Sequence, residues 1–163
     1  MHWLGEALVE SECQLHAYAL MTNHVHPLLT SKKAAAVPRL IMSLRRRYVQ
    51  YINRTHHRTG TFWDSRYKSS VVQADDYLLS CMRYIELNPV LAAMVDDPAH
   101  YRWTSYRHNG LGQTDGRITA HPIYSALGLG EKSRQSAYRN NRVTTGDGPR
   151  LFAKAAVSCA RAS

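Results

Sequence analysis

The sequence predicts an α+β domain in which helices pack against an antiparallel sheet. Two apolar runs, residues 13–21 and 24–30, are separated by the polar pair Thr22-Asn23, which is typical of a β-hairpin. Three other segments show the 3.6-residue period of a helix, and these are residues 1–11, 34–55 and 75–88. Helices on both sides of a hairpin in the chain favour the α+β class.

The two predicted strands of the hairpin differ in their patterns. In the first strand every second residue is apolar, so one face is predicted to carry Cys13, Leu15, Ala17, Ala19 and Met21. The second strand contains Pro27, which has no N–H to donate and belongs at a sheet edge or bulge.

The later elements follow from local signals. Helix 34–55 has Pro38 in its first turn, where proline is tolerated. Residues 61–73 are rich in aromatic and β-branched residues, which predicts a third strand. Helix 75–88 begins with two aspartates, which suit the positive end of a helix dipole, and we expect Pro89 to end it.

The chain carries a large excess of positive charge. Its 21 Lys and Arg residues outnumber 12 Asp and Glu residues, for a net charge of +9. A basic domain most often binds nucleic acid, although a generally basic surface would give the same count. The candidate DNA contacts are Arg45, Arg46, Arg47 and Arg54 in the long helix, Arg66 and Lys68 in the third strand, and Arg102, Trp103 and Arg107. The rings of residues 101–107 would equally suit a strap that packs back on the domain.

Nothing in the sequence indicates secretion or a membrane span. The chain has no run of about 18 apolar residues, and its start does not resemble a signal peptide. The three scattered cysteines, Cys13, Cys81 and Cys159, indicate a reduced cytoplasmic protein without a disulfide framework. We therefore expect no membrane partner.

Two histidines in the second strand are candidates for a metal site. His24 and His26 are two residues apart, so their imidazoles point to the same side of the strand, with Cα atoms about 6 to 7 Å apart. Such a pair can share one metal ion, although it is more often an ordinary structural or solvated pair.

Helix 75–88 supplies a candidate nucleophile beside a further ligand. Tyr84 and Asn88 are one turn apart on a face that borders the apolar stripe of this helix. A tyrosine phenol can attack phosphorus when a metal polarises the phosphate, and an asparagine oxygen suits Mg²⁺ or Mn²⁺. A half-buried helical tyrosine is also a common packing residue.

Four sequence motifs occur in a specific order within about residues 1–140. They are His24-Val25-His26, Phe62-Trp63-Asp64-Ser65-Arg66-Tyr67-Lys68-Ser69-Ser70, Tyr84-Ile85-Glu86-Leu87-Asn88-Pro89-Val90 and Tyr101-Arg102-Trp103-Thr104-Ser105-Tyr106. In this combination the sequence resembles the single-tyrosine HUH transposases, and within them the REP-associated tyrosine transposases, which are relatives of insertion-sequence transposases.

The resemblance implies a ferredoxin-like α+β fold with an antiparallel sheet flanked by helices, here without the family's first strand. It implies that His24, His26 and Asn88 hold Mg²⁺ or Mn²⁺ and that Tyr84 is the nucleophile. The implied reaction is cleavage and rejoining of single-stranded DNA at repeat hairpins through a 5′-phosphotyrosine, as in DNA transposition. The expected partner is hairpin or single-stranded DNA, and the protein would be a monomer or homodimer in the bacterial cytoplasm, associated with the nucleoid.

These expectations divide the chain into two parts. Residues 1–107 are expected to form an N-terminally truncated catalytic domain, and residues 108–163 a basic, partly helical extension with a disordered end. Pro27 and Leu91 replace an aliphatic residue and an arginine that the family usually has. One alternative is therefore a catalytically inactive, truncated DNA-binding remnant. A metal hydrolase unrelated to DNA would need another strong ligand, for which no motif of the HExxH kind is present.

Overall fold

The computed structural model of the chain describes residues 1–60, 67, 69–72, 75–141 and 157–158. Its elements in chain order are α1 (His2–Ser11), β1 (Cys13–Leu20), β2 (His24–Ser31), α2 (Ala36–Thr55), α3 (Asp75–Leu91), the 3₁₀ helix η1 (Pro98–His100), α4 (Tyr106–Asn109), α5 (Pro122–Ser125), α6 (Glu131–Asn140) and β3 (Val157–Ser158). The predicted hairpin and the three predicted long helices are confirmed.

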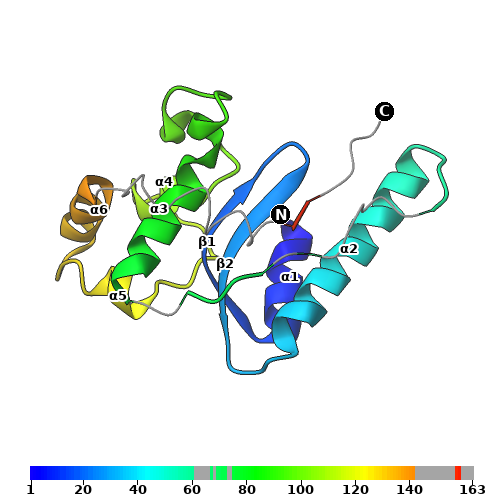
Figure 1. Cartoon of the computed structure of the whole chain (residues 1–163), viewed down its shortest axis with the longest axis horizontal. Helices are drawn as coiled ribbons and strands as arrows, with labels where there is room; N and C mark the ends of the chain where they lie inside the picture. Colours follow the sequence, from blue (N-terminus) through cyan, green and yellow to red (C-terminus); the bar gives the residue numbers. More distant parts are fainter. Residues whose placement is uncertain (61–66, 68, 73–74, 142–156, 159–163) are drawn as a thin grey trace.

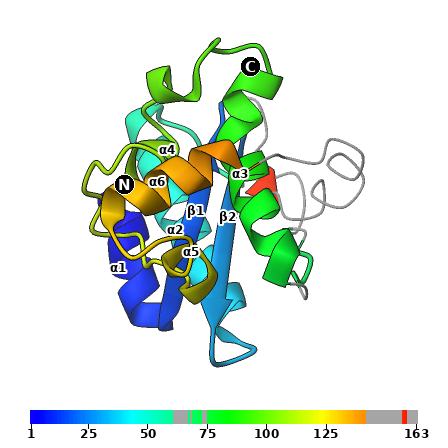
Figure 2. The same cartoon turned by 90° about the vertical axis from the view of Figure 1, so that its left-hand side faces the viewer.

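The sheet forms the middle layer of the molecule. β1 and β2 pair antiparallel, and β3 adds two residues to β2 beside His24 and Val25. α1 and α2 cover one face of the sheet, while α3 covers the other, with α5 and α6 beyond it (Figures 1 and 2). This arrangement confirms an α+β fold with an antiparallel sheet flanked by helices, and it is consistent with a ferredoxin-like fold.

A β-bulge at His16 divides β1 into two halves that face opposite ways. Leu15 pairs with Leu29 and Ala17 pairs with Leu28, so His16 is the extra residue. The His16 ring is held by the backbone oxygen of Thr119 at 2.7 Å and by Thr30 Oγ1 at 2.8 Å.

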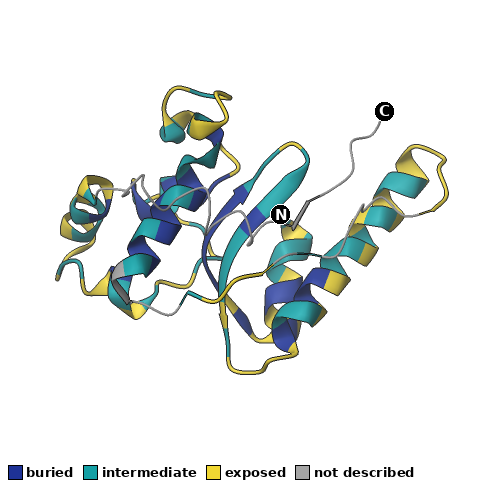
Figure 3. Ribbon diagram, in the orientation of Figure 1, coloured by how far each residue is buried: buried dark blue, intermediate teal, exposed yellow. Residues whose placement is uncertain are grey.

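The predicted single apolar face of β1 is therefore wrong. The bulge sends Cys13 and Leu15 toward α1 and α2, whereas Ala17, Ala19 and Met21 pack against α3. Both clusters are buried on their own side of the sheet, as the dark residues of Figure 3 indicate.

The outer edge of β1 is covered by the chain that follows α3. The N–H of Leu20 donates to the oxygen of Trp103 at 2.9 Å, and the N–H of Ser105 donates to the oxygen of Tyr18 at 3.0 Å. Near the start of β1, the N–H of Thr119 donates to the oxygen of Leu15 at 2.8 Å. Backbone groups at this edge are thus paired without a further long strand.

Pro27 is accommodated within β2. It lies opposite Tyr18 in the pairing with β1. Within the described residues, β3 reaches only His24 and Val25, so at Pro27 the strand has a neighbour on one side only. A proline is tolerated there because a missing N–H on an unpaired edge breaks no ladder hydrogen bond.

Helix α3 does not end at Pro89, contrary to the prediction, but continues to Leu91. Proline cannot donate to the oxygen of Ile85, and the side chain of Asn88 replaces this donor. Its Nδ2 donates to the oxygen of Tyr84 at 2.9 Å and to that of Ile85 at 3.4 Å. The side chain therefore supports the last turn of the helix.

The predicted third strand, residues 61–73, lies mostly outside the described residues. Where the chain is described, at residues 67 and 69–72, it has no regular secondary structure. Tyr67 packs at the margin of the α1–α2 cluster.

Residues of the predicted C-terminal extension share the core with the rest of the chain. Tyr124 of α5 and Tyr138 of α6 are buried in the cluster that also contains Met82 and Ile85 of α3. The division at residue 107 remains a prediction, and the expected disorder concerns residues that lie largely outside those described.

Asp115 ties this later part of the chain to β1. It accepts hydrogen bonds from Tyr18 Oη at 2.9 Å and from Arg117 Nη2 at 2.9 Å. Burial opposes ionisation of Asp115, but the hydrogen bonds from Arg117 and Tyr18 outweigh it, and they lower the pKa of this carboxyl group.

We predict that Asp115→Asn lowers the free energy of unfolding by about 1 kcal/mol at pH 7, since Arg117 remains partly solvated. A lowered pKa stabilises the fold above the ordinary aspartate pKa of about 3.9, and this contribution is lost as the pH falls toward the folded-state value. In thermal melts, the difference in Tm between wild type and variant should therefore become smaller below about pH 4. A difference in Tm that is as large at pH 3 as at pH 7 would contradict stabilisation by the ionised carboxyl group of Asp115.

Candidate functional site

The two candidate histidines lie on the sheet face that α3 covers. His26 is paired with Ala19 across the hairpin, and paired residues share a face. Ala19 is fully buried against α3, which places His26 and its i−2 neighbour His24 on the same side. Figures 1 and 2 show the C-terminal half of α3 running toward the hairpin turn that precedes His24.

The two imidazole rings lie close together and at right angles. Their centroids are 4.6 Å apart, with an interplanar angle of 89°. His24 Nδ1 is 2.6 Å from Asn23 Oδ1. Because an amide oxygen only accepts, Nδ1 carries the proton and the lone pair of His24 is on Nε2.

His26 has a buried nitrogen that the described protein atoms do not satisfy. The residue is 6% exposed, and its Nε2 has no hydrogen-bond partner among the described residues. A buried polar atom of this kind normally has a partner, so it points to a bound group. The donor chemistry fits a metal ion, since an imidazole nitrogen beside a second imidazole is a common ligand pair.

Both rings are held in the neutral form. Burial lowers the pKa of His24. Burial, aided by the neighbouring His24, lowers the pKa of His26 to about 4. Neutral imidazoles keep the lone pair that a metal needs.

Tyr84 and Asn88 lie on the helix that faces these histidines. Tyr84 packs at the margin of the α3 core cluster. Burial, and to a lesser extent Cys81, raises the pKa of Tyr84, so its phenol is protonated at neutral pH. The amide nitrogen of Asn88 is used by its own helix, and its Oδ1 takes no part in those two bonds.

The described ranges contain no group of three or more His, Cys, Asp or Glu side chains placed to hold a metal. The predicted ligand set includes only two residues of these types, His24 and His26. A metal bound there would therefore depend on the amide oxygen of Asn88 and would keep open positions for substrate or water.

The predicted DNA-binding arginines of α2 lie on the helix that covers the other face of the sheet. Arg47 is held by ion pairs with Glu6 and Glu10 of α1, the second at 2.8 Å. Its guanidinium therefore joins two helices. Arg66 and Lys68 lie outside the described residues.

Residues 101–107 combine the two alternatives predicted for them. Tyr101 Oη donates to the oxygen of Leu20 at 2.7 Å, and Tyr106 is buried, so both pack back on the domain. Trp103 is 39% exposed, and Arg102 Cζ lies 4.3 Å from its ring centre. Arg107 Nε donates to the oxygen of Ala99 at 2.9 Å.

Glu86 is a residue of this region that the sequence interpretation missed. It is fully buried on α3, between Tyr84 and Asn88 in the chain. Burial raises its pKa, against hydrogen bonds from Ser105, Tyr138 and Asn109 that lower it. The sequence does contain one indication of a buried role for Glu86: it lies four residues after Met82 and therefore on the apolar stripe of the helix.

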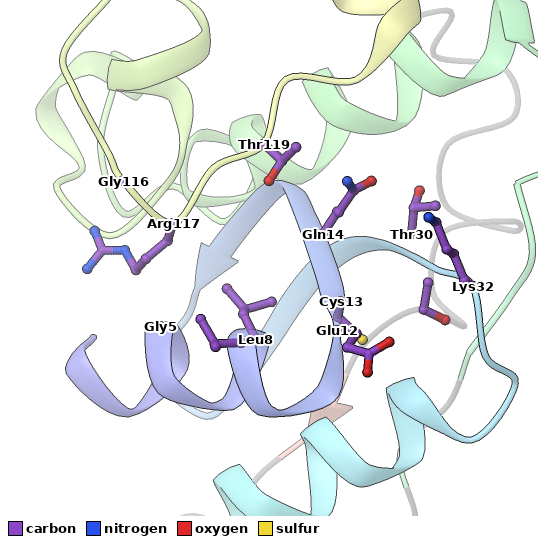
Figure 4. Close-up of a pocket in the computed structure, with 12 residues that line it drawn as sticks. Gly5, Leu8, Glu12, Cys13, Gln14, Thr30, Lys32, Gly116, Arg117 and Thr119 are labelled. Atoms are coloured by element: carbon purple, nitrogen blue, oxygen red, sulfur yellow. The ribbon is translucent and has the colours of Figure 1, made fainter.

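A separate cavity lies at the far end of the hairpin. It has a volume of about 510 Å³ and is lined by α1, the start of β1, the end of β2 and the loop at 116–119 (Figure 4). Its charged lining residues are Glu12, Lys32 and Arg117. Because β2 runs from His24 at one end to Ser31 at the other, this cavity is not part of the histidine site.

The comparisons with known proteins bear on the whole region. A family model described as "Transposase IS200 like" matches residues 2–88, which is more than half of the chain and includes both histidines, Tyr84 and Asn88. Neither the curated proteins nor the solved structures gave a significant match. None of the described helices is both long and apolar enough to cross a membrane. With its α+β fold and this match, the chain belongs to the IS200-like transposase family.

Proposed function

We propose that this transposase cleaves and rejoins single-stranded DNA at repeat hairpins of the REP type, with Tyr84 as the nucleophile. The observation that carries the proposal is the buried Nε2 of His26, which has no hydrogen-bond partner within the described ranges. It lies beside His24 on the face covered by the Tyr84 helix. Two adjacent imidazoles on the sheet face that the tyrosine-bearing helix covers suit metal-assisted attack on a phosphate.

His24, His26 and the Oδ1 of Asn88 would hold Mg²⁺ or Mn²⁺. When bound, such an ion would neutralise negative charge on the scissile phosphate. Asn23 keeps His24 in the tautomer whose Nε2 can act as a ligand. Burial lowers the pKa of His26 to about 4, so its ring is neutral at pH 7.

The reaction is a transesterification at phosphorus. Tyr84 Oη forms a bond to the phosphorus atom and releases its proton to solvent. The bond from phosphorus to the 3′ oxygen breaks, and this oxygen takes a proton to become a free 3′ hydroxyl. Attack by a 3′ hydroxyl on the phosphotyrosine reverses these steps and rejoins the strand, so no nucleotide cofactor is consumed.

The DNA surface would combine Trp103 with Arg102 at the β1 edge and Arg45, Arg46 and Arg54 on α2. The rest of α2 carries no acidic residue, which favours a polyanion along this helix. Arg66, Lys68 and Arg107 remain predicted contacts. With DNA as its partner, we place the protein at the bacterial nucleoid as a monomer or homodimer.

Trp103→Ala should weaken binding of single-stranded DNA about tenfold, because stacking one base on an aromatic ring contributes about 1–3 kcal/mol. Fluorescence anisotropy with a labelled hairpin oligonucleotide measures the effect. Leu129→Ala is the matched control, since Leu129 is a fully exposed apolar residue on another part of the surface. Equal affinities for both variants would show that Trp103 is not a stacking platform.

The nicking reaction itself is tested with an oligonucleotide that carries a repeat hairpin and a label on either side of the cleavage point. With Mn²⁺ or Mg²⁺ we expect a protein–DNA adduct that carries the label 3′ of the cut, and a free fragment that ends in a 3′ hydroxyl. An adduct that carries the other label would contradict the 5′-phosphotyrosine.

A second candidate function is DNA binding without cleavage, as in an inactive remnant of the family. It is favoured by Asn88, whose amide nitrogen is committed to α3, and by Pro27 one residue after His26. Such a protein would bind hairpin DNA with a strong dependence on salt. It would form no adduct with either metal in the same assay.

A further inference from the structure

Glu86 accepts three hydrogen bonds from the part of the chain that follows the family match. Ser105 Oγ donates to Oε1 at 2.6 Å, Asn109 Nδ2 to Oε1 at 2.8 Å, and Tyr138 Oη to Oε2 at 2.7 Å. All four side chains are buried. Both carboxyl oxygens of Glu86 thus act as hydrogen-bond acceptors.

Ser105 connects this carboxylate to the sheet. Its Oγ accepts the backbone N–H of Tyr18 at 2.9 Å while it donates to Glu86. A single hydroxyl therefore joins β1 to α3.

Asn109 makes a second connection of the same kind. Its Nδ2 donates to the oxygen of His16 in β1 at 3.0 Å and also to Glu86. Tyr124 Oη in turn donates to the backbone oxygen of Asn109 at 2.7 Å, which helps to hold the asparagine in place.

Arg83 adds a packed cation beside this network. Its guanidinium carbon lies 5.4 Å from the ring centres of both Tyr106 and Tyr138. These rings come from segments that also carry or flank the hydrogen-bond donors to Glu86. Arg83 thus packs the turn of α3 just before Tyr84 against residues of α4 and α6.

We propose that Glu86 is a positioning residue, which with Ser105 and Asn109 fixes the distance between Tyr84 and the histidine strand. The connection runs from β2 to its partner β1, through Ser105 or Asn109 to Glu86, and along α3 to Tyr84 two residues away. This inference rests on the proposed role of Tyr84. It assigns residues 105–138 a function in holding the site, although they lie outside the matched range 2–88.

Ser105→Ala tests the connection with little loss of packing, because it removes one hydroxyl. We expect kcat for nicking to fall about 10- to 100-fold, since small misplacements of reacting groups cost this much. The Kd for the hairpin DNA should stay the same. Glu86→Gln keeps an oxygen for Ser105 and Asn109 and should retain kcat within about threefold of wild type.

The control is Ile41→Val or Leu40→Ala in the cluster on the other face of the sheet, chosen so that its fall in Tm matches that of Ser105→Ala. Hydrogen exchange of the α3 amides supplies a readout that does not need activity. We expect faster exchange in α3 for Ser105→Ala and not for the control.

If Ser105→Ala and its control show the same fall in kcat and the same increase in hydrogen exchange of α3, the network is only structural. The proposal is then overturned. If wild type does not nick DNA at all, the proposed function fails. The exchange measurement then still decides whether Ser105 and Glu86 hold α3 on the sheet. Unchanged α3 exchange in Ser105→Ala would overturn that connection independently.

Discussion

Tyr84→Phe is expected to abolish the protein–DNA adduct and to reduce nicking at least about 1,000-fold, as removal of a nucleophile does in other covalent mechanisms. The substitution removes one oxygen and leaves the ring that packs at the margin of the α3 cluster. Stability and DNA affinity should therefore remain near those of wild type. Denaturing gel electrophoresis with a labelled hairpin oligonucleotide measures the adduct directly.

Tyr77→Phe is the matched control for this experiment. Tyr77 is also a partly buried tyrosine of α3 that packs against the same cluster, two turns before Tyr84. We expect this variant to form the adduct at the wild-type level. An adduct that persists in Tyr84→Phe would exclude Tyr84 as the nucleophile, and loss in both variants would indicate a general effect on α3.

His26→Ala is expected to remove metal binding together with nicking. Loss of one of two imidazole ligands should weaken Mn²⁺ binding at least about 100-fold, since even changes to the groups around a ligand cost 10- to 100-fold. Mn²⁺ binding by electron paramagnetic resonance is measured without DNA, so the result does not depend on activity.

The thermal stability of this variant separates a metal ligand from an ordinary core histidine. His26 is buried, so His26→Ala leaves a cavity and lowers the Tm in metal-free buffer whatever the role of the ring. The response to the metal ion therefore decides between the two roles. Added Mn²⁺ should raise the Tm of wild type and leave that of His26→Ala unchanged. His56→Ala, at an exposed position after α2, is the control and should respond as wild type does. A Tm rise with Mn²⁺ in His26→Ala would contradict the assignment.

The hairpin shows which structural features a local sequence pattern can predict and which it cannot. A period of two residues was enough to predict that His24 and His26 share a face of their strand. It was not enough to choose the face, because the choice depends on the pairing of His26 with Ala19 and on the bulge at His16. The bulge is stabilised by Thr30 and Thr119, and Thr119 is 103 residues away in the sequence.

Helix α3 shows a different reason for a wrong prediction. Proline normally ends a helix because it leaves a carbonyl without a donor. Here Asn88, immediately before Pro89, supplies that donor from its side chain. On α2, Arg47 forms ion pairs with two acids of α1, a contact that no pattern within either helix predicts.

By itself, the sequence determined the hairpin, the long helices, the spacing of the two histidines and the turn that carries Tyr84 and Asn88. These depend on periodicity within one segment, which neighbouring residues encode. Only the tertiary structure decided which sheet face the histidines occupy and what holds α3 against that face. The partners of Glu86 are 19, 23 and 52 residues away, and no local period can specify contacts over such separations. They form because a buried carboxylate must be met by donors, from whichever segments the fold brings to it.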